Sequence, residues 1–105
     1  MAGPSAKPDP FVQPRVRLDK WLWAARFFKS RVLAADLVAS GHLRLNSQPC
    51  RKSAHGVHLG DVLTFPQGRQ IRVVRVLALG EIRGPATQAQ QMYQDLAPAT
   101  DPPLE

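Results

Sequence analysis

The side chains in this sequence that could do chemistry are mostly cations, and they fall in three groups along the first half of the chain. They lie around an aromatic-rich stretch, a short turn that contains a serine, and a polar stretch that begins with a glycine. These cations are Arg15, Arg17, Lys20, Lys29, Arg31, Arg44, Arg51 and Lys52. Guanidinium and ammonium groups bind phosphate oxygens, and arginine can do so with two parallel hydrogen bonds. Cations from three neighbouring elements would suit one extended polyanion.

The positive charge is concentrated in the middle of the chain. Residues 15–83 hold thirteen of the 14 Lys and Arg but only four Asp and Glu, a net charge of +9, while one Lys and four Asp and Glu give the rest −3. With a pI of about 10.5, this distribution is typical of nucleic-acid binders, because neutralising phosphates releases condensed counterions. A merely soluble cationic surface is the alternative explanation.

Catalysis is not expected. The acidic residues between 15 and 83 have structural explanations for the most part: Asp19 as a helix cap, Asp36 as a helix-surface charge and Asp61 as a turn residue, with Glu81 left over. A general acid and base would need two carboxylates in distinct environments, which this spacing does not provide. We expect a protein that is not an enzyme.

No metal site or cofactor is expected either. Cys50, His55 and His58 are of the residue types that zinc prefers, but a structural zinc needs four protein ligands and His42 is distant in the sequence. No glycine-rich phosphate loop is present. The histidines are interpreted as loop or strand residues that could meet RNA.

The sequence predicts a cytoplasmic protein without a membrane segment. Cys50 is the one cysteine, so no intramolecular disulfide can form. No apolar run approaches the roughly 20 residues that span a bilayer, and no signal-peptide pattern opens the chain. The small size and the lack of an obvious second apolar stripe favour a monomer.

The cations must be positioned by two helices. The first helix is expected over 18–28, and Asp19 can cap it. Its buried stripe consists of Leu18, Trp21, Leu22, Ala25 and Phe28. Lys20, Trp23 and Phe27 form a second face, for which packing against the C-terminal segment is favoured over stacking on a nucleobase.

Ser30 is a good N-cap for the second helix, which Gly41 ends. Arg31 lies in the first turn of this helix, where the helix dipole disfavours a cation. A bound phosphate would reverse that effect.

Beyond Gly41 the hydrophobic period changes from helical to alternating. Leu43 and Leu45 alternate with polar residues, Ser47-Gln48-Pro49 predicts a turn, and short strands are expected at 57–59, 62–65 and 70–79. On the last of these, Arg72 and Arg75 fall on opposite faces. A final helix is expected from Gly84-Pro85 to Leu96, with Ala86, Ala89, Met92 and Tyr93 on its docking side. The class is α+β: two N-terminal helices packed on a short antiparallel sheet, with a C-terminal helix.

The domain organisation follows from composition. Residues 1–14 and the acidic residues 97–105 are proline-rich and are expected to be disordered tails. The basic domain is expected at 15–80 and a helical extension at 81–96.

With these residues placed, three segments together resemble the S-four RNA-binding domain: Arg17 to Trp23, Gly41 to Asn46, and Gly60 to Phe65. The stretch Arg17 to Trp23 with Lys29-Ser30-Arg31, and the segment Gly84 to Tyr93, are similar in particular to the heat-shock protein fifteen family. The resemblance covers about residues 15–96. Relatives often continue into a long basic C-terminal tail, whereas this chain ends in a short acidic one.

The resemblance implies an αL-type surface, made by the two helices and the following strand, that grips structured ribosomal or transfer RNA. It further implies association with the large ribosomal subunit, in rescue and recycling of stalled nascent chains. The implied phosphate contacts are Arg15, Arg17, Lys20, Lys29, Arg31, Arg44, Arg51 and Lys52.

Three alternatives stay open from the residues. The chain could bind tRNA or another structured RNA, or it could be a protein-interaction adaptor that uses the face of Trp23 and Phe27. A DNA-binding role is less favoured, because neither helix carries a row of base-reading side chains.

Overall fold

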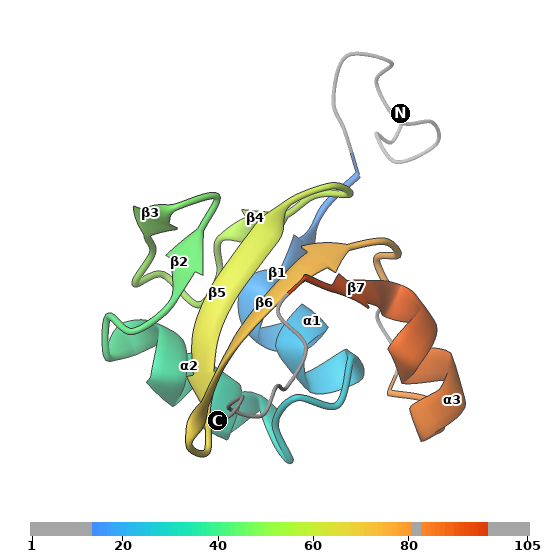
Figure 1. Ribbon diagram of the computed structural model, residues 1–105. Helices are drawn as coiled ribbons and strands as arrows, with labels where there is room; N and C mark the ends of the chain where they lie inside the picture. Colours follow the sequence, from blue (N-terminus) through green and yellow to red (C-terminus); the bar gives the residue numbers. More distant parts are fainter. Residues whose placement is uncertain (1–13, 81–82, 97–105) are drawn as a thin grey trace, which may run out of the picture.

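The computed structural model describes residues 14–80 and 83–96 (Figure 1). Its elements, in chain order, are β1 (Val16–Arg17), α1 (Leu18–Ala24), α2 (Arg31–Ala39), β2 (Arg44–Leu45), β3 (Gln48–Pro49), β4 (Gly56–Val57), β5 (Val62–Gln67), β6 (Gln70–Val76), α3 (Ala86–Ala89), the 3₁₀ turn η2 (Gln90–Met92) and β7 (Tyr93–Asp95). The two tails expected to be disordered lie outside the described residues, apart from Pro14. Among the described residues, no helix has the length and apolar character needed to cross a membrane.

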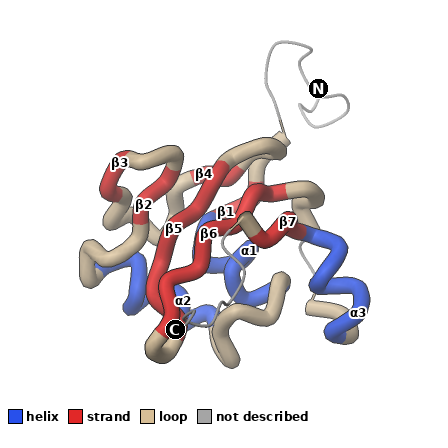
Figure 2. The backbone as a smooth tube through the Cα atoms, viewed as in Figure 1, coloured by secondary structure: helices blue, strands red, loops and turns tan. Residues whose placement is uncertain are grey.

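A five-stranded antiparallel sheet organises the fold, with the strand order β3-β2-β5-β6-β7 (Figure 2). The long hairpin of β5 and β6 forms its centre, and Leu63 lies opposite Val74 in the register. Helices α1 and α2 cover one face of this sheet (Figure 1). The predicted α+β class, with two helices on an antiparallel sheet, is confirmed.

The core lies between the two helices and the sheet. Trp21, Leu22 and Leu18 of α1 are fully buried, as are Leu63 and Phe65 of β5. Burying side chains of this size stabilises a fold by about 1.5–3 kcal/mol each. The indole Nε1 of Trp21 donates a hydrogen bond to the carbonyl oxygen of Ala78 at 2.8 Å, so its polar atom is satisfied as well.

Helix α1 is shorter than predicted, and the reason lies at Arg26. The helix ends at Ala24 rather than at Phe28, because Arg26 takes a left-handed backbone with φ of 68°. Its Nε donates a hydrogen bond to the carbonyl oxygen of Gly84 at 2.7 Å, which holds this turn. The reversal of the chain changes where the next two side chains point.

Phe27 is therefore a core residue, and its assignment to a second face with Lys20 and Trp23 was wrong. It is 6% exposed, and its ring centroid lies 4.6 Å from that of Tyr93 and 5.1 Å from that of Phe65. The expected packing against the C-terminal segment is confirmed. An adaptor face made of Trp23 and Phe27 loses one of its two members.

Helix α2 begins and ends as predicted. The Ser30 hydroxyl oxygen accepts a hydrogen bond from the backbone N–H of Leu33 at 3.1 Å, and Gly41 follows the helix with φ of +88°. Val32 and Leu33, however, are exposed, and the fully buried contacts come from Ala34 and Val38.

The strands after α2 differ from the expected ones in two places. The turn lies at Asn46 and Ser47, both with positive φ, so Gln48–Pro49 is strand β3 instead of a turn. The strand expected at 57–59 is the short β4, which pairs with β1, an element not predicted.

The C-terminal segment is helical only as far as Met92, so the helix predicted to reach Leu96 was wrong over its last turn. Tyr93–Asp95 instead forms β7 and pairs with β6. Arg72 of β6 donates to the Asp95 carboxylate at 2.9 Å, and this ion pair fixes the added strand. The segment after the basic domain thus completes the sheet.

Candidate nucleic-acid interface

A buried carboxylate organises the cations at the start of the two helices. Asp19 was expected to cap α1, but the N-cap position is Arg17 and Asp19 lies inside the first turn with a side chain 6% exposed. Arg17 donates to it with Nε at 3.1 Å and Nη2 at 2.9 Å. Arg31 reaches the same carboxylate with Nη2 at 3.5 Å. Two arginines that are far apart in sequence are thereby held side by side.

The electrostatics of this cluster favour the ionised carboxylate. Burial on its own raises the pKa of Asp19, but the hydrogen bond and charge of Arg17, the charge of Arg31 and the backbone N–H of Lys20 together lower it below its ordinary value. The guanidinium groups stay 51% and 43% exposed on their side chains. Each therefore has N–H groups left for a further anion.

Replacing Asp19 with Asn is expected to lower the free energy of unfolding by about 1–2 kcal/mol at pH 7, since hydrogen bonds to charged groups are lost. Because the folded-state pKa of Asp19 is depressed, its contribution is full above its ordinary pKa of about 4 and fades as the pH falls below that value. Urea unfolding at pH 7 and pH 3 measures this: the gap between wild type and Asp19→Asn should shrink at pH 3. Asp36→Asn, on the exposed surface of α2, is the control. A gap that stays constant or widens would contradict the assignment.

The position of Arg31 is explained by the same pair. Sequence alone suggested that a cation in the first turn of α2 was poorly placed, because the helix dipole repels it. In the structure Arg31 gains the Asp19 carboxylate in compensation. It remains exposed at the helix start, beside the exposed Lys29.

The loop of residues 50–55 connects this cluster to the far end of α2. The backbone N–H groups of Leu18 and Asp19 donate to the carbonyl oxygens of His55 and Ser53, at 2.8 and 3.1 Å. At the other end of the loop, the backbone N–H of Cys50 donates to the carbonyl oxygen of Leu43. The loop therefore runs from the end of α2 to the start of α1.

Two glycines, one near each end of this loop, allow an arginine side chain to pack directly against the backbone. A Cβ atom on Gly41 would come within 2.9 Å of Nη2 of Arg51, so the guanidinium lies against the backbone at the C-terminus of α2, where the helix dipole favours a cation. A Cβ atom on Gly56 would come within 2.6 Å of Cδ of Arg15, so that side chain runs over the loop's other end.

We call the resulting line of cations the cationic track; it consists of Arg15, Arg17, Arg31, Arg51 and Lys52. All five residues are exposed. The Asp19 carboxylate contacts two members of the track, Arg17 and Arg31, and is paired with both. A chain of phosphates could follow the track from one end of the loop to the other.

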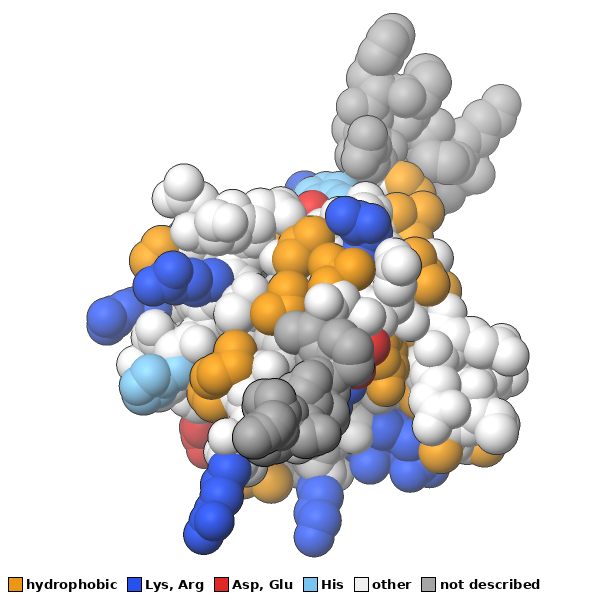
Figure 3. Space-filling model, in the orientation of Figure 1, with side chains coloured by type: hydrophobic (Ala, Val, Ile, Leu, Met, Phe, Trp, Pro, Cys, Tyr) orange, Lys and Arg blue, Asp and Glu red, His pale blue; other side chains and the backbone are white. Residues whose placement is uncertain are grey.

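The other three predicted site residues are not part of the track. Lys29 is exposed in the α1–α2 loop, and Lys20 is half-buried on α1 and is not a free cation. Arg44 is exposed on β2, between the buried Leu43 and Leu45, so it points to the sheet face that the helices leave open. Figure 3, which looks onto that face, shows Lys and Arg around its margin and hydrophobic side chains in its middle.

Several arginines outside the predicted set bind within the protein. Arg83 donates to the carbonyl oxygens of Trp23 at 3.0 Å and Phe28 at 2.6 Å, and it lies over the ring of Trp23. Arg72 pairs with Asp95. Arg83 thus fastens the C-terminal segment to the chain between the helices, and Arg72 fastens β7 to β6; their spacing in sequence did not signal either role.

Among residues 14–80 and 83–96, no group of three or more His, Cys, Asp or Glu side chains is placed to hold a metal ion.

Asp61 has the structural role predicted for it. Its carboxylate accepts a hydrogen bond from the backbone N–H of His58 at 2.8 Å and another from the side-chain amide of Asn46 at 3.1 Å.

Comparison with known proteins places these features in context. The family model described as S4 domain matches residues 16–63. Heat shock protein 15 of Escherichia coli is 43% identical over 86 residues, which are 82% of this chain and 64% of that protein. The Haemophilus influenzae homologue is 40% identical over 83 residues, 79% of this chain and 63% of that protein. The chain thus spans less than two thirds of the length of these curated relatives.

A solved structure is similar over most of the fold. The trimeric structure of Vibrio cholerae heat shock protein 15 superposes with a TM-score of 0.76 at 39% identity, covering 80% of this chain and 84% of that one.

Proposed function

The chain belongs to the heat shock protein 15 family, and from that premise we propose that it is a non-catalytic protein that binds structured ribosomal RNA. The proposal includes association with the large ribosomal subunit in the rescue or recycling of stalled nascent-chain complexes. Other structured RNA, such as tRNA, is the alternative partner.

The observation that carries this proposal is the cationic track. Asp19 holds Arg17 and Arg31 together at the start of the two helices, and the loop that is hydrogen-bonded to the start of α1 carries the exposed Arg51 and Lys52. Pre-positioned guanidinium groups lose less side-chain freedom on binding phosphate than solvated ones do. Such a line suits recognition of folded RNA by phosphates and shape more than by base sequence.

A binding role without catalysis agrees with the carboxylates of the described residues. Asp19, Asp61 and Asp95 all accept structural hydrogen bonds, and Asp36 lies exposed on α2. None of the four is set beside a second carboxylate in a cleft, as a general acid and base would need. The adaptor alternative is weakened by the burial of Phe27.

The proposal also concerns the oligomeric state in which the protein binds RNA. The Vibrio cholerae relative is trimeric in its structure. For this chain we propose a monomer on the basis of its small size, and light scattering on the purified protein would measure this directly.

Co-sedimentation of the full chain with separated ribosomal subunits tests the proposal. We expect it to pellet with the large subunit at low salt and to be released as salt rises, because phosphate contacts are salt-sensitive. Binding to neither subunit would contradict the ribosomal proposal. Binding to free tRNA in the same buffers would then favour the alternative partner.

A further inference from the structure

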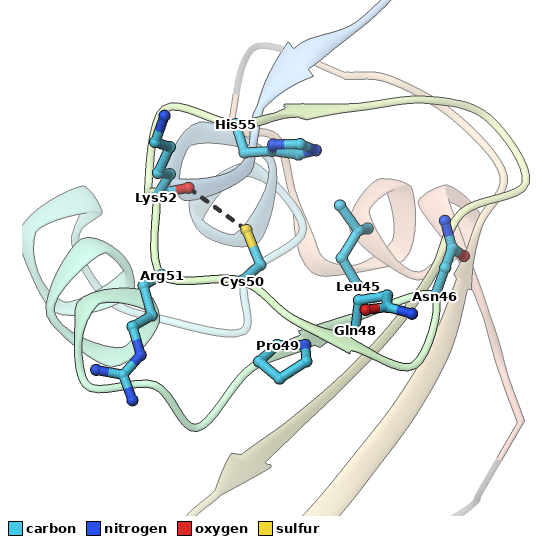
Figure 4. A pocket seen from close by; sticks show the side chains of 8 residues that line it. All are labelled: Leu45, Asn46, Gln48, Pro49, Cys50, Arg51, Lys52 and His55. Atoms are coloured by element: carbon cyan, nitrogen blue, oxygen red, sulfur yellow. Dashed lines mark hydrogen bonds between the residues drawn. The ribbon is translucent and has the colours of Figure 1, made fainter.

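A hollow of about 450 Å³ lies beside the cationic track, between the β2–β3 hairpin and the loop of residues 50–55 (Figure 4). Its volume falls within the roughly 300–1,000 Å³ range of small-molecule sites. The lining residues are Leu45, Asn46, Gln48, Pro49, Cys50, Arg51, Lys52 and His55. Arg51 and Lys52 also belong to the cationic track, whereas the other six have no part in the phosphate contacts proposed above.

Part of the lining of the hollow is apolar and could contact a planar ring. Leu45, Pro49 and Cys50 supply apolar surface, and the imidazole of His55 comes from the opposite arm, the loop. Figure 4 shows the side chains of Leu45 and His55 near its centre. RNA-binding proteins stack unpaired bases on rings of this kind, histidine included.

Polar groups that could read a base edge are present and uncommitted. Within the described part of the chain, the Gln48 amide and the His55 imidazole make no hydrogen bond with protein. The Asn46 amide, by contrast, is already used: its Oδ1 accepts from the backbone N–H of Val62 and its Nδ2 donates to Asp61. Gln48 offers both a donor and an acceptor to the hollow.

The charges around the hollow match a nucleotide. None of its eight lining residues is acidic. The side chains of Arg51 and Lys52 point away from its centre at the margin (Figure 4), where flanking phosphates would lie if a base entered. Arg15, whose side chain runs over Gly56 next to His55, adds a third cation to that margin.

We propose that this hollow binds a single unpaired nucleotide of the RNA, with its base against His55 and Leu45 and its edge read by Gln48, which lies opposite Leu45 in the hairpin. The proposal rests on the proposed function and deepens it: the cationic track holds the RNA backbone, and the hollow selects a site where a base is unstacked. A base within a continuous A-form helix cannot enter, because it is stacked and paired. The protein therefore distinguishes a bulge or loop from plain duplex.

The test compares three kinds of fluorescent RNA hairpin by anisotropy with the full chain. The first is fully paired, the second has a one-nucleotide bulge made in turn with each of the four bases, and the third has an abasic residue at the bulge. The abasic hairpin matches the bulged one in phosphate number, so the difference between them reports the base alone. At least one bulged base is expected to bind about tenfold more tightly than the abasic residue, within the range that stacking of one base gives.

The double variant Gln48→Ala, His55→Ala should reduce this ratio to near one and leave the affinity for the abasic hairpin unchanged. The matched control His42→Ala, Gln70→Ala removes the same residue types from exposed positions outside the hollow and should keep the ratio. Equal binding of the bulged and abasic hairpins by wild type, with salt-sensitive affinity for both, would overturn the nucleotide pocket and leave the proposed function standing. Binding to no hairpin at all would overturn both.

Discussion

The full chain carrying Arg51→Glu and Lys52→Glu is expected to bind a folded ribosomal RNA fragment on the order of 100-fold more weakly than wild type at physiological salt, because two attractive phosphate contacts become repulsive. Both residues are exposed, and neither has an ion pair among the described residues. The melting temperature should fall by only a few degrees, roughly what replacing a cation with an anion at the C-terminus of α2 costs. Anisotropy with labelled RNA, together with thermal unfolding by circular dichroism, measures the two effects.

The matched control for this variant is the pair Arg69→Glu, Arg75→Glu. It changes the net charge by the same amount at two exposed positions, in the β5–β6 turn and on β6, away from the loop of residues 50–55. We expect a much smaller loss of affinity from the control, because only general attraction is reduced. If both variants lost the same affinity, binding would depend on total charge and the track would have no special part in it.

The largest effect on stability is expected for Phe27→Ala, which should lower the free energy of unfolding by about 3–5 kcal/mol. The ring of Phe27 is buried against Tyr93 and Phe65, and the guanidinium of Arg72 lies 5.2 Å from its centroid. Its removal opens a cavity where the loop between the helices, the sheet and β7 meet. For a domain of this size the melting temperature should fall by roughly 15–30 °C.

Urea and thermal unfolding measure this change, and Ile71→Ala serves as the control. Ile71 is 59% exposed on β6, so its truncation should alter the free energy of unfolding by no more than about 0.5 kcal/mol. A loss below about 1 kcal/mol for Phe27→Ala would mean that the C-terminal segment packs less tightly on the domain than the structure indicates.

Local chemistry allowed part of this fold to be predicted from sequence. The serine cap and the glycine end of α2 are set by neighbouring residues, and the alternation of Leu43 and Leu45 depends only on the period of a strand. The hairpin of β5 and β6 follows from β-branched residues on either side of a turn. In each case the signal and the structure lie within a few residues of each other.

The elements that were missed depend on contacts between distant segments. Strand β1 has two residues and exists because Val57 lies opposite Val16. Strand β7 carries a helical pattern of apolar residues, but Tyr93 packs on Phe27 and Asp95 pairs with Arg72, so tertiary contacts override the local preference. The left-handed turn at Arg26, which redirects Phe27 into the core, has no signature such as glycine.

The candidate site shows the same division. Composition and spacing pointed to the cations, because a basic patch is the electrostatic footprint of a nucleic-acid binder. They could not reveal that Asp19 joins Arg17 to Arg31, nor that Arg51 lies on Gly41 at the end of α2. They also gave no sign of the hollow, which forms only when loop and hairpin come together.

The measurement that tests the central claim most directly is the salt dependence of RNA affinity for wild type and for Arg51→Ala, Lys52→Ala. The slope of log affinity against log salt concentration counts the phosphates that the protein neutralises. If the cationic track binds the RNA backbone, this double variant should lower the slope by roughly two, about one for each lost phosphate contact, while Arg69→Ala, Arg75→Ala leaves it unchanged. A slope that is the same in wild type and in the track variant would contradict the account.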